Sequence, residues 1–407
     1  MNTPLPQHLE HVRDAALTAL GDLKEAGAAQ EGDSHALMMA SRTDAGDDLP
    51  DYYLVYFLLV DLLGFYNMGK WEKTAWAVPI RYRGRLYSIE HRKFGVGIFA
   101  PTYEANLRTF PNGAIASGEP TEENERDARE MCILVKKAVA KAEPYFEWRA
   151  EQVVATEKLN VTNNSDWLFD RYEYLRDEHK RLCEEFERRK DDHDIKKYKD
   201  GSIGSVWPAY EIRRHAEWTG QAAIDAFFSW TEHAFIHFAI LHGRIKNGQE
   251  VAALAEGEWK SKFKAALPID NDPEIKGYYD TLSNLRTKIR NYMAHGAFGK
   301  RGEAFHFHSG AGAVPVLLTR RPLHRYTLSG EPALDEKSGL LEIGKFIAYL
   351  HTTDAAIPLE FVQSGLPSIL TFVSDGRYAK AMASMEAMRD FIKHMNYLVD
   401  GAANMDL

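Results

Sequence analysis

Apolar positions recur at three- and four-residue steps over most of the chain, which predicts a largely helical protein. Helices are expected over residues 5–28, 51–69, 122–148, 166–199, 212–242, 271–296, 338–362 and 376–400, with further helix in the 250s. Residues 29–50 are rich in Gly, Asp and Ser, which predicts a loop. Residues 76–82 alternate instead, which predicts a strand, and Arg83-Gly84 predicts a two-residue turn into strands over residues 85–99.

This change of period predicts a mostly α protein that is α+β overall, with three parts along the chain. Residues 1–160 are expected to form an α+β domain with a small antiparallel sheet, and residues 161–210 a charged helical connector. Residues 211–407 are expected to form a helical bundle with a hairpin inserted at about 303–328. The helix over 166–199 has a narrow apolar stripe, which favours an arm or a dimer contact over a core helix.

The helix over residues 271–296 has both of its ends marked by sequence signals. Asp272 is a favourable N-cap, and Gly296 suits the left-handed conformation that ends many helices. Polar groups concentrate in its last turns, which carry Arg290, Asn291 and His295.

These side chains have the chemistry that cleavage of RNA requires. A five-residue step rotates by about 140° and rises by about 7.5 Å, so Arg290 and His295 reach a cleft at the helix end from different faces. A guanidinium can bind a phosphate bidentately, and an imidazole can act as base or acid near neutral pH. One histidine cannot be base and acid at once, so two chains related by a two-fold axis would complete the set.

The segment from Arg290 to Gly296, RNYMAHG, resembles the signature of HEPN domains, in which four to six residues separate an arginine from a histidine. The resemblance covers residues 212–300 and one or both C-terminal helices, but not the first 160 residues. It implies an antiparallel bundle of about four helices that acts as a homodimeric, metal-independent endoribonuclease without a cofactor. The resemblance also implies that Arg290 holds the scissile phosphate, that His295 performs acid–base chemistry, and that Asn291 orients one of them or the ribose.

The resemblance also implies a biological role and an alternative to catalysis. HEPN proteins are often toxins or phage-defence effectors, so the N-terminal domain would be a sensor that receives a regulatory protein or an activating signal. Other HEPN domains keep the fold without the activity. A non-catalytic subunit that binds nucleic acid or protein in a defence or regulatory assembly therefore stays open.

Charged residues near Arg290 and His295 are expected to orient Arg290 or to contact RNA. Glu232 and Asp225, on a polar strip of the helix over 212–242, are expected to line the cleft and orient Arg290. A local basic patch is expected to contact RNA through Lys288, Arg286 and Lys300.

Two histidine pairs have open interpretations. His233 and His237 lie four residues apart on one helix face, as metal ligands can, but their order, EHxxxH, differs from the HExxH of zinc proteases. A polar strip packed between helices explains them as well. His306 and His308 share one face of a strand, which fits either an RNA or metal contact or a solvated surface.

A metal-dependent nuclease is a more distant hypothesis. Glu90 and Lys93 approach the Glu-x-Lys pattern of one nuclease class, but the residue two positions after Glu90 is Arg92. The basic and aromatic residues around them suit a phosphate-binding strand or an ordinary charged sheet face.

The composition of the chain excludes some classes of partner and indicates the compartment in which the protein acts. The net charge is −9, which excludes binding of nucleic acid through bulk positive charge. Two distant cysteines exclude a disulfide scaffold and suit a reducing compartment. We find no signal peptide and no apolar run long enough to span a bilayer, so a cytoplasmic protein without a membrane partner is expected.

Overall fold

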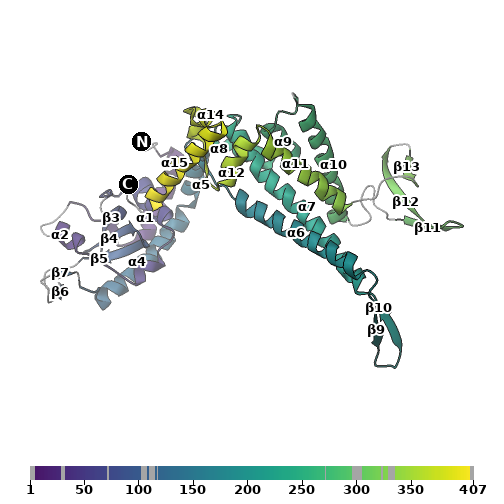
Figure 1. Ribbon diagram of the computed structural model, residues 1–407. Coiled ribbons are helices and arrows are strands. Elements are labelled where there is room, and N and C mark those ends of the chain that lie inside the picture. The colour runs from purple at the N-terminus through teal and green to yellow at the C-terminus, as the bar shows by residue number, and fades with distance from the viewer. Residues whose placement is uncertain are drawn as a thin grey trace. The chain divides into compact units, whose positions relative to one another are not determined.

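The structure is a computed structural model that describes residues 5–28, 33–70, 73–101, 108–109, 115–116, 118–270, 272–295, 305–321, 324–328 and 335–403. The chain divides into two compact units, one of Met1–Val153 with Gly401–Leu407 and one of Val154–Asp400 (Figure 1). The described residues are mostly helical and include a five-stranded antiparallel sheet, which confirms the predicted mostly-α, α+β class.

The first unit is built on the predicted strands. Its sheet has the order β1-β3-β4-β5-β2, with β3 (Thr74–Tyr82), β4 (Arg85–Arg92) and β5 (Gly95–Ala100) at the centre. Arg83 and Gly84 have φ values of 48° and 79°, so the expected two-residue turn is confirmed. The short strands β6 (Arg108–Thr109) and β7 (Ile115–Ala116) pair with each other.

Helices of the first unit share a core with this sheet. They are α1 (Glu10–Leu20), α3 (Tyr52–Tyr56) with its π-helical continuation η3 (Phe57–Leu62), α4 (Glu122–Lys141) and α5 (Glu143–Val154). The short helix α2 (Asp33–Met38) contacts β4. Thr121 is a residue type that favours the N-cap, and in the structure Thr121 and Asn124 form a reciprocal capping box at the start of α4.

Two expectations for the first unit were wrong. The helix expected over 5–28 ends at Leu20, because Gly21 has φ +57° and Leu23 begins the edge strand β1 (Leu23–Glu25). The loop expected over 29–50 contains α2, β2 (Ser41–Arg42) and the 3-10 helix η2 (Ala45–Asp48). Pairing of β2 with β5 supplies order that local propensity does not predict.

The second unit is a helical assembly around α7 (Pro208–Leu241). Its other helices are α6 (Ser165–Arg189), α8 (Gly248–Glu256), α9 (Trp259–Ala266), α10 (Pro273–His295), α11 (Glu336–Thr352), α12 (Ala356–Gln363), α13 (Thr371–Ser374), α14 (Arg377–Ala381) and α15 (Met385–Ala403). The strands β8 (Asn160–Val161) and β14 (Ser368–Ile369) pair. As its near-continuous apolar surface predicts, α7 is buried on most sides, and its aromatic side chains form the centre of the core.

The helix α6 lies antiparallel to α7, and the two are joined by a β-ribbon of β9 (Asp194–Lys197) and β10 (Ile203–Val206) (Figure 1). The helix expected over 166–199 therefore ends ten residues early. Its narrow apolar stripe was expected to suit an arm or a dimer contact better than a core helix, but Tyr172 and Leu182 are buried and Tyr172 belongs to the core around α7.

A second β insertion follows α10. The predicted hairpin is confirmed and extended to three antiparallel strands, β11 (Phe305–Ser309), β12 (Gly312–Arg321) and β13 (His324–Thr327). Among the helices that the structure describes, none combines the length and apolar character needed to cross a bilayer.

Candidate functional site

The helix α10 begins as its sequence predicts. Asp272 Oδ1 accepts hydrogen bonds from the backbone N–H groups of Glu274 at 2.8 Å and Ile275 at 3.2 Å. Its apolar stripe is buried, including Leu285 and Ile289. The last residue of α10 is His295.

Packing against α11 fixes the direction of α10. The Tyr278 ring lies 5.4 Å from the ring of Phe346, whereas Leu285 lies against Gly339, where an added Cβ would meet Leu285 Cδ1 at 3.0 Å. The two helices are therefore antiparallel. We call the end of the second unit where α10 ends at His295 and α11 begins at Glu336 the motif end.

The helix α7 runs parallel to α11 and so antiparallel to α10. Gln221 Nε2 donates to Glu336 Oε1 at 2.9 Å, and further along both helices the Phe235 ring lies 6.4 Å from Phe346. A position later in α10 therefore lies level with a position earlier in α7.

The motif residues occupy the last turns of α10, but their side chains lie outside the described part of the structure. Arg290, Asn291 and His295 are helical in their backbone, and Gly296 and Lys300 lie beyond the described residues. Arg290 follows Arg286 by four residues, so the two positions share one face of α10.

The structure brings Glu232 and Arg286 together across α7 and α10. Glu232 Oε1 accepts a hydrogen bond from Arg286 Nη2, and its Oε2 lies 2.7 Å from Nζ of Lys262 on α9. The Arg286 guanidinium also lies over the Phe228 ring at 5.3 Å. Burial raises the pKa of Glu232, but the Lys262 hydrogen bond and the Arg286 charge outweigh it, so its pKa lies below the ordinary value. Glu232 therefore stays ionised and links three helices.

Asp225 lies on the face of α7 that carries Glu232, two helical turns earlier, and is exposed. Because α7 and α10 are antiparallel, the face of α10 that continues from Arg286 to Arg290 runs toward the level of Asp225. The structure does not bring Asp225 into the Glu232 cluster.

The residues of the expected basic patch have different surroundings in the structure. The Arg286 guanidinium already has a carboxylate partner, so it serves the contact between α7 and α10, and its role in RNA binding stays a prediction. Lys288 is half-buried on the same helix.

His237, which is buried, and His233, which is half-buried, belong to one hydrogen-bonded network. His237 Nδ1 lies 2.7 Å from Ser368 Oγ, and His237 Nε2 lies 3.2 Å from His233 Nε2. The Asn164 backbone N–H donates to His233 Nε2 at 2.9 Å. These contacts join α7 to the start of α6 and to β14, which supports the packed polar strip.

This network predicts an acid-sensitive fold. Burial lowers the pKa of His237 from 6.5 to about 3, and burial also lowers the pKa of His233. Below pH 6.5 the unfolded chain takes up protons that the folded chain excludes. Stability should therefore be full above pH 6.5 and fall toward pH 3, by about 1.4 kcal/mol per pH unit for His237, and His233 adds to the loss in the same direction.

Urea denaturation at pH 7, 6 and 5 measures this loss. His237→Gln should be less stable at pH 7 but lose less stability as the pH falls, whereas the exposed His351→Gln should keep the wild-type dependence. Equal pH dependence in both variants would contradict the assignment.

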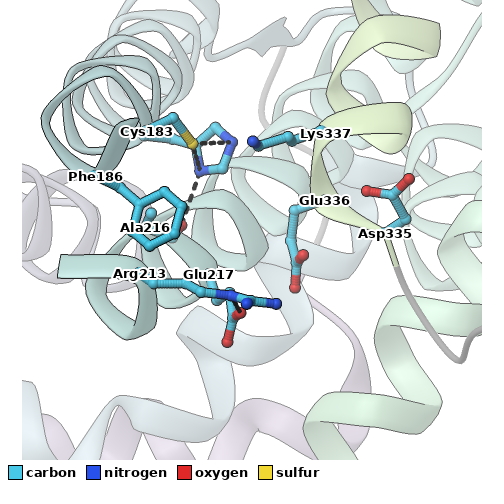
Figure 2. Close-up of a pocket in the computed structure, with 9 residues that line it drawn as sticks. Cys183, Phe186, Arg213, Ala216, Glu217, Asp335, Glu336 and Lys337 are labelled. Atoms are coloured by element: carbon cyan, nitrogen blue, oxygen red, sulfur yellow. Dashed lines mark hydrogen bonds and ion pairs between the residues drawn. The ribbon is translucent and has the colours of Figure 1, made fainter. Parts of the chain in front are cut away.

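A cavity of about 260 Å³ lies between α6, α7 and the start of α11 (Figure 2). His179 Nδ1 lies 2.8 Å from the Ala216 carbonyl oxygen, which can only accept, so Nδ1 carries the proton and Nε2 faces Cys183 Sγ at 3.6 Å. Burial raises the pKa of the Cys183 thiol, which keeps it protonated. The cavity thus presents an imidazole beside a protonated thiol near the motif end, between charged side chains from α7 and α11.

Sequence reasoning missed this cavity, although two signals were present. His179 and Cys183 are four residues apart on α6 and so share a face. Gly220 lies inside a long helix, where an added Cβ would meet His179 Nδ1 at 2.8 Å and Glu336 Cβ at 2.9 Å. The glycine permits the close packing of α6, α7 and α11.

The remaining candidates belong to strands and not to α10. His306 and His308 are exposed on β11. Glu90 is buried and ion-paired with Arg92 at 2.7 Å, and burial raises its pKa. Within the described ranges no three His, Cys, Asp or Glu side chains are grouped as metal ligands.

Comparisons with family models, with curated proteins and with solved structures found no match to this chain.

Proposed function

We propose that this chain is a metal-independent endoribonuclease of the HEPN type that acts in the cytoplasm as a homodimer. The observation that carries the proposal is the Glu232–Arg286 contact, which holds the last turns of α10 against α7. It supports a fixed position for the backbone of Arg290, Asn291 and His295 at the motif end. Pre-positioned groups are what catalysis by orientation and charge requires.

The proposed reaction is attack of a ribose 2′-oxygen on the adjacent phosphorus. The P–O5′ bond breaks, so the products carry a 2′,3′-cyclic phosphate and a 5′-hydroxyl. His295 of one chain takes the 2′-hydroxyl proton, and the same histidine of a second chain protonates the leaving 5′-oxygen. Arg290 stabilises the charge that develops on the phosphorane, and Asn291 orients the histidine or the ribose.

The homodimer follows from this stoichiometry, because one chain supplies one motif histidine. A toxin or antiviral-defence role accompanies the family resemblance, with RNA as the substrate and the first unit as the receiver of an activating signal.

Incubation of the purified chain with labelled RNA in EDTA tests the proposal. We expect cleavage in EDTA, and we expect that added Mg²⁺ leaves its rate unchanged. A folded dimer that binds RNA but cleaves none would contradict catalysis and favour a non-catalytic HEPN module. Cleavage that EDTA abolishes would instead favour a metal-dependent nuclease.

A further inference from the structure

We propose that single-stranded RNA binds along the β9–β10 ribbon and one exposed face of α7, a surface that we call the RNA path. It comprises Lys196, Lys197 and Lys199 with Tyr210, Arg214 and Trp218. That this RNA is a substrate rests on the proposed function, whereas its binding rests on the geometry of the path.

The ribbon carries cations without carboxylate partners. Lys196, Lys197 and Lys199 are exposed, and no Asp or Glu side chain of the described residues lies within 4.0 Å of their amino groups. The arginines around them differ: Arg189 pairs with Asp192 at 3.2 Å, Arg213 with Glu217 at 3.0 Å and Arg214 with Glu211 at 3.6 Å. The ribbon also carries two exposed carboxylates, Asp194 and Asp200, but the three lysine amino groups are available for phosphate groups.

Exposed aromatic rings continue from the ribbon onto α7. Tyr210 is 72% exposed and Trp218 is 57% exposed. Arg214 lies between them at four-residue steps, and its guanidinium lies 5.4 Å from the Trp218 ring centre. Successive unpaired bases stack on such a row of aromatic rings and a guanidinium.

The same face of α7 leads to the site proposed for catalysis. Asp225 and Glu232 follow Trp218 at seven-residue steps, which are two helical turns each. The distance along the helix from Tyr210 to Glu232 is about 33 Å at 1.5 Å per residue. An RNA strand on the path would therefore run toward Glu232 and the face of α10 that carries Arg286 and Arg290.

The combination of lysines with a row of stacking groups favours RNA over a second copy of the ribbon as the partner. Ile195 and Ile203 are 71% and 66% exposed, and such apolar side chains alone would suit a protein partner. The isoleucines lie beside lysine amino groups, however, because Lys197 pairs with Ile203 across the ribbon, and the Tyr210–Arg214–Trp218 row continues from the ribbon onto α7. A polyanion neutralises the lysines, and its sugars and bases can cover the isoleucines.

Fluorescence anisotropy with the full-length chain and a labelled 2′-O-methyl RNA strand tests the path without cleavage, since the probe lacks the nucleophilic hydroxyl. The double variant Tyr210→Ala/Trp218→Ala should weaken binding by about tenfold or more. The matched control is Trp167→Ala/Tyr174→Ala, which removes rings of 67% and 71% exposure from α6 and should bind as the wild type does.

Replacement of Lys196, Lys197 and Lys199 by serine should lower the dependence of log Kd on log salt concentration by about 2, at about 0.7 per lost phosphate contact. The triple serine variant at Lys136, Lys137 and Lys141 of α4 is the control and should keep the wild-type slope.

Wild-type binding of the aromatic or lysine variants would overturn the path, as would failure of the wild type to bind the strand. Variants that lose dimerisation in light scattering but keep RNA binding would overturn it in favour of a protein interface. If the variants bind as expected while natural RNA stays intact, the path stands and the proposed nuclease fails.

Discussion

Replacement of Arg290 or His295 by alanine should lower the rate of RNA cleavage in EDTA by at least about 100-fold. General acid–base catalysis contributes about 10²–10⁴-fold, and loss of a cation beside the phosphorane has an effect of similar size. The measurement is the initial rate on a labelled RNA strand at pH 7, with protein in excess over substrate.

The control for this loss is Asn284→Ala, an exposed position of the same helix. It should retain wild-type activity, and all three variants should unfold within about 0.5 kcal/mol of the wild type. Full activity of Arg290→Ala or His295→Ala would remove the residue from the proposed mechanism.

Replacement of Glu232 by alanine should destabilise the second unit by about 3 kcal/mol, because it leaves the Lys262 ammonium buried without a counter-charge. The Lys262 residue is 4% exposed, and its amino group lies 2.7 Å from Glu232. We expect the lower end of the range for broken buried pairs, since the side chains of Glu232 and Arg286 remain 31% and 33% exposed. Urea denaturation at pH 7 measures the change.

Asp225→Ala is the matched control for Glu232→Ala. It removes a carboxylate from the same face of α7, but an exposed one, and should change stability by less than about 0.5 kcal/mol. Addition of Lys262→Met to Glu232→Ala should recover part of the loss, because it removes the stranded charge. Equal effects of the two single variants would contradict the helix-linking role of Glu232.

The Glu232 cluster also has a defined dependence on pH. The folded pKa of Glu232 lies below the ordinary value of 4.5. Its contribution to stability is therefore present above pH 4.5 and is lost as the pH falls through the folded pKa.

Sequence signals predicted the helix ends and the turn that depend on only a few adjacent residues. Asp272 caps α10, Thr121 caps α4, and Arg83-Gly84 forms its turn because each depends on neighbours in the chain. Leu23 fits the apolar stripe of α1 equally well, but it pairs with Tyr82 in the sheet, and that tertiary contact decides its conformation.

The β9–β10 ribbon was missed for a different reason. Its lysine-rich strands continue the charged composition of α6, so periodicity alone extends the helix. Asp200-Gly201 was the available signal, and Gly201 has φ +81° at the turn.

The candidate site was predictable only in part. The spacing of Arg290 and His295 is visible in the sequence, but the partner of Arg286 lies 54 residues away, on another helix. The sequence alone therefore predicts an RNA contact for Arg286 but not its contact with Glu232, and the RNA contact stays a prediction. The cavity beside His179 is lined by residues of three helices, so no single stretch of sequence predicts it.

The chemistry of the product ends tests the central claim most directly. A defined RNA strand is incubated with the wild-type chain in EDTA, and the fragments are analysed by mass spectrometry. We expect a 2′,3′-cyclic phosphate on one fragment and a 5′-hydroxyl on the next. Fragments with a 3′-hydroxyl and a 5′-phosphate, or an intact strand, would contradict it.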